Sequence, residues 1–109
     1  MLAELFGGRT SEKCLLYMAA QGEGYSLEIA NAFGISNTQV LRTLSKLEQG
    51  DVLVGRNMGW ARVYSLNAKW YLAKELKALL NRALSNIPLD EQERYFMKRM
   101  SPRKKNKAV

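Results

Sequence analysis

Two amphipathic helical patterns in the middle of the chain are separated by only two residues before the second cap, Gly34 and Ile35. Ser26 stands at the start of the first pattern and Ser36 at the start of the second, and serine is a favoured N-cap residue. Helices joined so closely cannot lie antiparallel over a long loop. A short connection that contains glycine is typical of a helix-turn-helix motif, and this constrains the fold more than any other feature.

The first of these helices has polar and apolar residues at the expected positions. Glu28 lies in the first turn, where the helix dipole favours an acidic side chain. Ile29, Ala30 and Phe33 fall on one stripe, which we expect to be buried. Gly34 follows the last apolar residue and ends the helix, as glycine often does just past a C-terminus.

The second helix has stronger boundary signals. Ser36 and Gln39 have the spacing of a capping box, and Gly50 closes the helix. The residues expected on its buried side are Val40, Leu44 and Leu47, with Leu41 widening the apolar face.

The hydrophobic period changes from helical to alternating after Asp51. The segments VLVGR and ARVYSL are short and rich in β-branched and aromatic residues, and NMGW lies between them. Asn57 and Gly59 both tolerate positive φ, so the sequence predicts a β-hairpin. Trp60 at its tip either folds back onto the core or is an exposed contact residue. The hairpin residues expected to face the core are Leu53, Tyr64 and Leu66.

Helical patterns also flank this central unit. A helix capped by Thr10 or Ser11 covers EKCLLYMAA, and a long helix capped by Asn67 covers Ala68–Asn86 with an unusually broad apolar surface. Pro88 opens a last helical segment, PLDEQERYFMKRM, with acids early and bases late.

The residue inventory excludes most catalytic chemistry. The chain has no histidine and one cysteine, so no intramolecular disulfide, Cys/His zinc cluster or histidine-activated nucleophile can form. Cys14 lies at helical spacing from Met18, and we expect it to be a small buried hydrophobe, with a reactive thiol as the alternative. No nucleophile–base pair, metal-ligand set or phosphate loop is visible, so we expect neither an enzyme nor a bound cofactor or metal.

The charge of the chain favours a polyanionic partner. Seventeen Lys+Arg against ten Asp+Glu give a formal net charge of +7. Residues 101–109 form a basic tail without acids, which we expect to be disordered and which contributes Arg103, Lys104, Lys105 and Lys107. Removing those four charges still leaves +3. A basic protein with no apolar run long enough for a bilayer and no signal-peptide pattern is expected in the cytoplasm with the nucleoid, away from membranes.

The segment from Leu27 to Leu66 resembles the winged-helix repressors of the ArsR type and related bacterial regulators. The segments KLEQGDVLVGR and RVYSL are similar to that family's helix end and wing strands. The resemblance implies a mainly α winged helix-turn-helix fold, with a small β-hairpin wing and extra terminal helices. The residues that fill the family's glycine, turn and core positions are Ala30, Gly34, Ile35, Val40, Leu44 and Leu47.

One departure from that family concerns metals. Its metal sensors carry paired cysteines in the recognition helix or added ligands in the terminal helices. Thr43, Leu44 and Ser45 stand in the recognition helix here, and histidine is absent. Metal sensing is therefore not implied.

The outward face of the second helix carries the residues expected to read DNA. The major groove of B-DNA admits one α-helix, and each base pair presents a distinct pattern of donors and acceptors there. Asn37, Thr38, Gln39 and Arg42 are expected near base edges, and Lys46, one turn later, near a phosphate. Ser36 and the first helical amides are expected to meet another phosphate. The alternative for this face is an ordinary solvated helix surface.

Two arginines flank the hairpin tip. Arg56 and Arg62, with only Asp51 nearby as an acid, are expected on phosphates or in the minor groove beside the wing. The alternative is that they only keep an exposed strand edge soluble.

We expect one winged-helix domain over residues 1–100, with its core in 10–67 and terminal helices in 68–100. The surplus apolar surface of Ala68–Asn86, with YFM at 95–97 and LAELF at 2–6, favours a homodimer; a monomer whose terminal segments cover its own core is the alternative. The predicted function is that of a dimeric transcriptional repressor on a palindromic double-stranded operator. The rivals are an architectural or replication-linked DNA binder of low specificity and a protein-interaction module.

Overall fold

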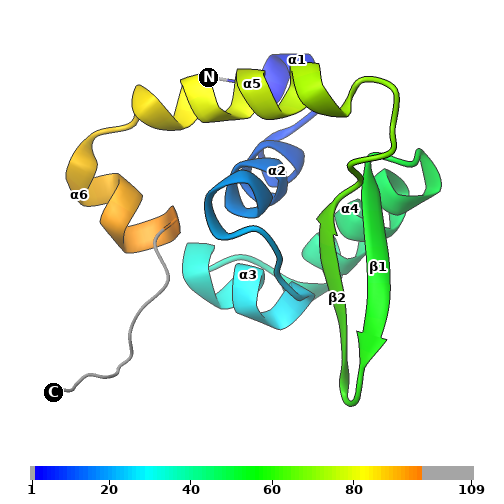
Figure 1. Ribbon diagram of the computed structural model, residues 1–109. Coiled ribbons are helices and arrows are strands. Elements are labelled where there is room, and N and C mark those ends of the chain that lie inside the picture. Colours follow the sequence, from blue (N-terminus) through cyan, green and yellow to red (C-terminus); the bar gives the residue numbers. More distant parts are fainter. Residues whose placement is uncertain (1, 97–109) are drawn as a thin grey trace, which may run out of the picture.

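The computed structural model describes residues 2–96 (Figure 1). In chain order its elements are α1 (Ala3–Phe6), α2 (Arg9–Gln21), α3 (Ser26–Phe33), α4 (Asn37–Gln49), β1 (Leu53–Met58), β2 (Ala61–Leu66), α5 (Ala73–Ser85), α6 (Leu89–Glu91) and the π-helix η1 (Gln92–Phe96).

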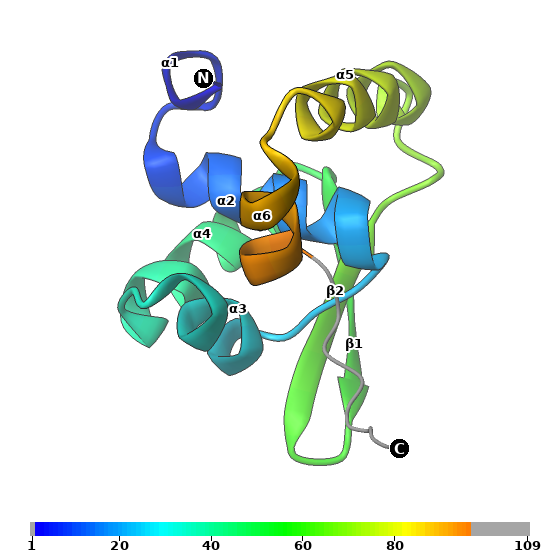
Figure 2. The same cartoon turned by 90° about the vertical axis from the view of Figure 1, so that its left-hand side faces the viewer.

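Helix α2 lies at the centre of the arrangement. It packs against α5 on one side and against α3 and α4 on another, and it also contacts η1. Figure 1 shows α5 crossing over α2, while the β1–β2 hairpin projects away from the helices as a wing. The rotated view in Figure 2 shows α3 and α4 together on the side of α2 opposite α5.

The core is centred on α2 and on the helix pair that follows it. All five residues from Cys14 to Met18 are buried, and Ile29, Val40 and Leu44 have no exposed surface. These contacts confirm the predicted buried stripes of α3 and α4, which Phe33 and Leu47 extend as partly buried residues. Leu41 is the exception: 45% of its surface is exposed, so it does not widen the apolar face.

The predicted hairpin is confirmed as an antiparallel pair in which Leu53 is opposite Leu66 and Met58 is opposite Ala61. Gly59 has φ +60° at the two-residue turn, where a left-handed backbone favours glycine. Asn57 was expected in this turn but lies within β1, because β1 continues through Met58 and pairs Asn57 with Arg62 and Met58 with Ala61. Leu53 and Tyr64 are buried and Leu66 packs against the core, as predicted.

A third segment extends this small sheet. Gly24, between α2 and α3, pairs with Tyr64 through two backbone hydrogen bonds of 2.9 and 2.8 Å. A Cβ atom at Gly24 would lie 2.8 Å from the ring of Tyr17, so only glycine fits between the strand and that buried ring. This bridge fixes the base of the wing on the helical core.

Three predicted helix starts were wrong. Helix α2 begins at Arg9 after Gly8, and α3 begins at Ser26 itself after Tyr25; neither has a side-chain cap, so the Thr10, Ser11 and Ser26 caps do not form. Helix packing therefore sets these two boundaries without help from a capping hydroxyl.

The third error concerns α5, which begins at Ala73 and not at Ala68. The side chain of Asn67 accepts a hydrogen bond from the Lys69 amide at 3.1 Å and donates one to the Asp51 carbonyl at 3.0 Å. Asparagine that bonds to nearby backbone in this way favours a turn over a helix. The chain between Asn67 and Ala73 is consequently a turn that leaves Tyr71 exposed.

The terminal segments cover part of the protein's own core. Phe96 is buried, and its ring and that of Tyr95 both lie 5.4 Å from the ring of Phe33. Leu2 and Phe6 also pack against the core. The expected late bases of the last segment, Lys98 and Arg99, Met97 of the predicted YFM surface and the tail at 101–109 lie outside the described residues. Across residues 2–96 no helix is long and apolar enough to cross a bilayer.

Candidate nucleic-acid interface

The turn between α3 and α4 is formed as its sequence predicts. Gly34 is left-handed, with φ +65°, and the Ile35 amide donates to the Ala30 carbonyl at 3.0 Å. The Ser36 hydroxyl then accepts a hydrogen bond from the Gln39 amide at 3.3 Å, which confirms the predicted cap. These contacts fix the direction in which the N-terminus of α4 points.

The predicted reading face of α4 lies in solvent. Its six predicted DNA-binding residues are exposed, while Val40 and Leu44 on the opposite side are fully buried. The first turn contains no acid. Within residues 2–96, neither Arg42 nor Lys46 forms an ion pair with a carboxylate. The exposed residues are Ser36, Asn37, Thr38, Gln39, Arg42 and Lys46.

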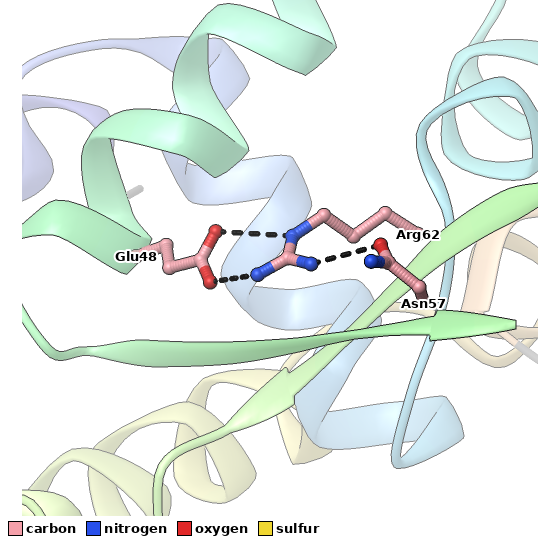
Figure 3. A network of polar contacts seen from close by, with 3 residues as sticks. All are labelled: Glu48, Asn57 and Arg62. Carbon is pink, nitrogen blue, oxygen red and sulfur yellow. Dashed lines mark hydrogen bonds and ion pairs between the residues drawn. The ribbon is translucent and has the colours of Figure 1, made fainter.

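Arg62 in the wing is exposed, but its guanidinium is hydrogen-bonded to other side chains of the protein. Its Nε and Nη2 atoms donate to the two carboxylate oxygens of Glu48 at 3.4 and 2.5 Å, and Nη1 donates to the Asn57 side chain at 2.9 Å (Figure 3). Glu48 belongs to the last turn of α4. A bidentate ion pair therefore holds the wing against the C-terminal end of that helix.

The space for this contact comes from Gly55. A Cβ atom there would lie 2.7 Å from the Arg62 Nε, so the arginine side chain runs directly across β1 where β1 has no side chain. The Arg62 guanidinium holds the pKa of Glu48 below its ordinary value by hydrogen bonding, and Glu48 raises the pKa of Arg62 in return. Both charges are thus kept at neutral pH.

Arg56 lies on the other face of the hairpin. Strand alternation separates it from Arg62, because Asn57 is the residue opposite Arg62 in the ladder. The Arg56 Nη2 atom donates to Glu23, in the loop between α2 and α3, at 2.7 Å. The expectation that Asp51 is the only acid near the two arginines was therefore wrong: Glu23 and Glu48 pair with them.

The sequence did not predict these acidic partners, because the prediction considered only residues close to the wing in sequence. Glu48 precedes Arg62 by 14 residues and Glu23 precedes Arg56 by 33, so no local spacing links them. The fold creates both contacts when the hairpin turns back over the end of α4 and beside the Gly24 segment. Gly55 was the available signal, since glycine within a strand often marks a close approach.

Cys14 and Trp60 are also placed by the structure. Cys14 is fully buried, and burial raises its pKa to about 12, so the side chain is a neutral thiol at physiological pH, which argues against the reactive-thiol alternative. Trp60 is 80% exposed at the wing tip, with its ring 4.9 Å from that of Tyr25 in an edge-on contact. Within residues 2–96 no group of three cysteine or acidic side chains is arranged to hold a metal ion.

Known structures share this arrangement, although sequence comparison alone does not place the chain. No protein-family model matches it, and a search of curated proteins gives no significant match. The YusO protein of Bacillus subtilis is 19% identical with a TM-score of 0.57, and the match covers 83% of this chain and 70% of that one. ZitR of Lactococcus lactis is 25% identical with a TM-score of 0.55, over 77% and 71% of the two chains.

The adhesin competence repressor AdcR of Streptococcus pyogenes is a third match, 21% identical with a TM-score of 0.54, over 84% of this chain and 77% of that one. Together with the helix pair and the hairpin, these likenesses establish the fold. The chain is a winged helix-turn-helix protein, mainly α with a small β-hairpin wing and additional terminal helices, as the sequence predicted.

Proposed function

We propose that this protein is a sequence-specific double-stranded DNA-binding transcriptional regulator. The observation that carries the proposal is the two-sided construction of α4: Val40 and Leu44 fix one side in the core, while the other presents polar and basic groups to solvent. The helix is held rigidly by its cap, the Gly34 turn and the wing contact at Glu48. A rigid helix with a free polar face is what major-groove reading requires.

Each residue of the face has a proposed role. In this proposal Asn37 and Gln39 pair with adenine and Arg42 pairs with guanine, and each good contact gives about 1–3 kcal/mol of discrimination between bases. Thr38 contacts bases or a thymine methyl group. Lys46 meets a phosphate one turn later, and Ser36 with the first α4 amides meets another at the positive end of the helix dipole.

The wing arginines take different roles in this proposal. Arg56 uses one nitrogen for Glu23, and its half-exposed side chain retains donors for a phosphate. All three nitrogens of Arg62 already donate to Glu48 and Asn57. We therefore assign Arg62 to positioning the wing, and a direct DNA contact by Arg62 requires its ion pair to open.

The proposed regulator is a homodimeric repressor that acts by occupying a palindromic operator. Leu79 on α5 and Leu72 in the turn just before α5 are both exposed, and Leu5 and Leu89 add exposed apolar surface in the terminal segments. Two protomers joined there would present their recognition helices to half-sites about one helical turn apart. The known repressor AdcR, which shares the fold, supports a regulatory role, and the ArsR-type resemblance and a cytoplasmic, nucleoid-bound location belong to the same proposal.

The test compares two double variants that each remove two positive charges. Arg42→Ala with Lys46→Ala alters the proposed face, and Lys74→Ala with Lys77→Ala alters exposed positions on α5. Fluorescence anisotropy on a mixed pool of labelled duplexes measures affinity across a salt series. We expect the first variant to reduce the slope of log affinity against log salt by about 1–2 per protomer, and the control to leave it unchanged.

The two rivals predict other results. Equal effects of both variants would favour an architectural binder that senses only net charge. Absence of DNA binding by the unmodified protein would leave the fold as a protein-interaction module.

A further inference from the structure

A pocket of about 310 Å³ lies beside the wing, between the hairpin and the segment that joins α2 to α3. Within the described residues its lining includes two acids and no base, in a chain whose net charge is +7. Carboxylates, two aromatic rings and apolar side chains line the pocket. The residues that define it are Glu23, Glu28, Tyr25, Trp60, Met58 and Val63, and we call it the acidic–aromatic pocket.

The chemistry of the acidic–aromatic pocket fits a lysine or arginine side chain. The faces of Trp60 and Tyr25 attract a cation, and Glu28 offers a charge-assisted hydrogen bond. The methylene stem of such a side chain would cover Met58 and Val63, as long basic side chains do on apolar surfaces. DNA phosphate is a poor occupant of the pocket, because the Glu28 carboxylate repels it and the charge of Glu23 is balanced by Arg56.

We propose that the basic C-terminal segment, residues 101–109, docks in the acidic–aromatic pocket of its own chain. The end of the described chain contacts the segment that leads into this pocket: the Gln21 side chain donates to the carbonyl of Phe96, and Gln21 precedes Glu23 by two residues. Arg103 follows Phe96 by seven residues, which span roughly 23–25 Å when extended. The segment can therefore reach the pocket, and its four cations complement Glu28 and also Glu23, whose carboxylate already pairs with Arg56.

Because the tail and the pocket belong to one chain, the bound state is populated even if the contact between them is weak. A segment tethered by a short flexible linker has an effective concentration in the millimolar range at its site. In the protein without DNA, the tail then occupies the acidic–aromatic pocket, and its cations cover the exposed ring of Trp60.

Trp60 itself reports on this contact. In a Trp70→Phe variant it is the only tryptophan, and acrylamide, a neutral quencher, measures how accessible its ring is. We expect the quenching constant to rise roughly two-fold when Arg103, Lys104, Lys105 and Lys107 are changed to glutamine, because the tethered segment is released. We call the Trp70→Phe protein the parent and its four-glutamine derivative the tail-neutral variant. Raising the salt concentration should raise the quenching constant of the parent by a similar factor and should change that of the tail-neutral variant little.

Two further variants locate the contact. Glu28→Gln should raise quenching in the parent and add nothing to the tail-neutral variant. A matched control changes four exposed bases around α5 to glutamine, namely Lys69, Lys74, Lys77 and Arg82, and should leave quenching unchanged. Equal quenching in parent and tail-neutral proteins, an equal rise in the α5 control, or no effect of Glu28→Gln would each overturn the proposal. Because no DNA is present, the result does not depend on the proposed regulatory function.

Discussion

At the residue scale, Ser36 connects the stability of the recognition helix to its orientation. It is the helix cap whose side-chain hydrogen bond is present in both the sequence prediction and the structure. Ser36→Ala should lower the free energy of unfolding by about 0.5–2 kcal/mol, measured by urea denaturation, because the Gln39 amide loses its partner. Ser45→Ala, on the exposed middle of the same helix, is the control and should be neutral or slightly stabilising, since alanine is the better helix former. Equal losses in both would contradict the role given to the cap.

Also at the residue scale, the Glu48–Arg62 pair has a defined pH dependence. The pKa of Glu48 is lowered by Arg62 in the folded protein, so the pair contributes stability above the unfolded pKa of a glutamate and loses that contribution as pH falls through the lower folded value. We expect Glu48→Gln to be less stable than the parent near neutral pH, with the difference vanishing in strong acid. Thermal unfolding of the two proteins across an acid pH series checks this. Because the pair is at the surface, the effect is small, and a difference that grows on acidification would contradict the assignment.

At the element scale, the position of the wing depends on two glycines that make close contacts, Gly24 and Gly55. Gly24→Ala should destabilise the protein by about 1–3 kcal/mol, because the added Cβ would lie 2.8 Å from the buried ring of Tyr17, so that the ring or the backbone must shift. Gly50→Ala is the matched control: its φ is −88° and its nearest new contact is 3.8 Å, so it should be neutral or gain up to about 1 kcal/mol. Thermal or urea unfolding distinguishes the two. Similar stabilities for both variants would show that the Gly24 bridge is not a tight junction.

Also at the element scale, some helices and strands were predictable from the sequence and others were not. The α3–α4 pair and the hairpin were predictable because their periodicity, Ser36, Gly34 and Gly59 all favour one local structure. The start of α5 was not, since the apolar pattern of 68–72 continues a helical period while Asn67 bonds to Asp51, 16 residues earlier. The ion pairs of Arg56 and Arg62 were not predicted for a similar reason, because their acidic partners Glu23 and Glu48 lie on other elements.

At the scale of the whole molecule, the arrangement of α5 sets the expected assembly. The side of α5 with Leu80 and Ala83 is buried in the protomer, whereas Leu72 and Leu79 are exposed. If the proposed dimer forms through this face, Leu72→Glu with Leu79→Glu should convert it to a monomer in sedimentation velocity. Leu27→Glu, on exposed α3 surface outside the proposed interface, should leave the mass unchanged. A monomeric parent protein, or a dimer that survives the double substitution, would contradict the proposed interface.

The central claim, that the exposed face of α4 reads DNA sequence, is tested most directly by affinity selection on a random duplex library near physiological salt, followed by sequencing of the bound pool. We predict an enriched palindromic motif whose half-sites lie about one helical turn apart, because two protomers present equivalent helices. Binding without enrichment would contradict sequence reading by Asn37, Gln39 and Arg42, and would favour an architectural role. Failure to retain any DNA would contradict the account of this surface altogether.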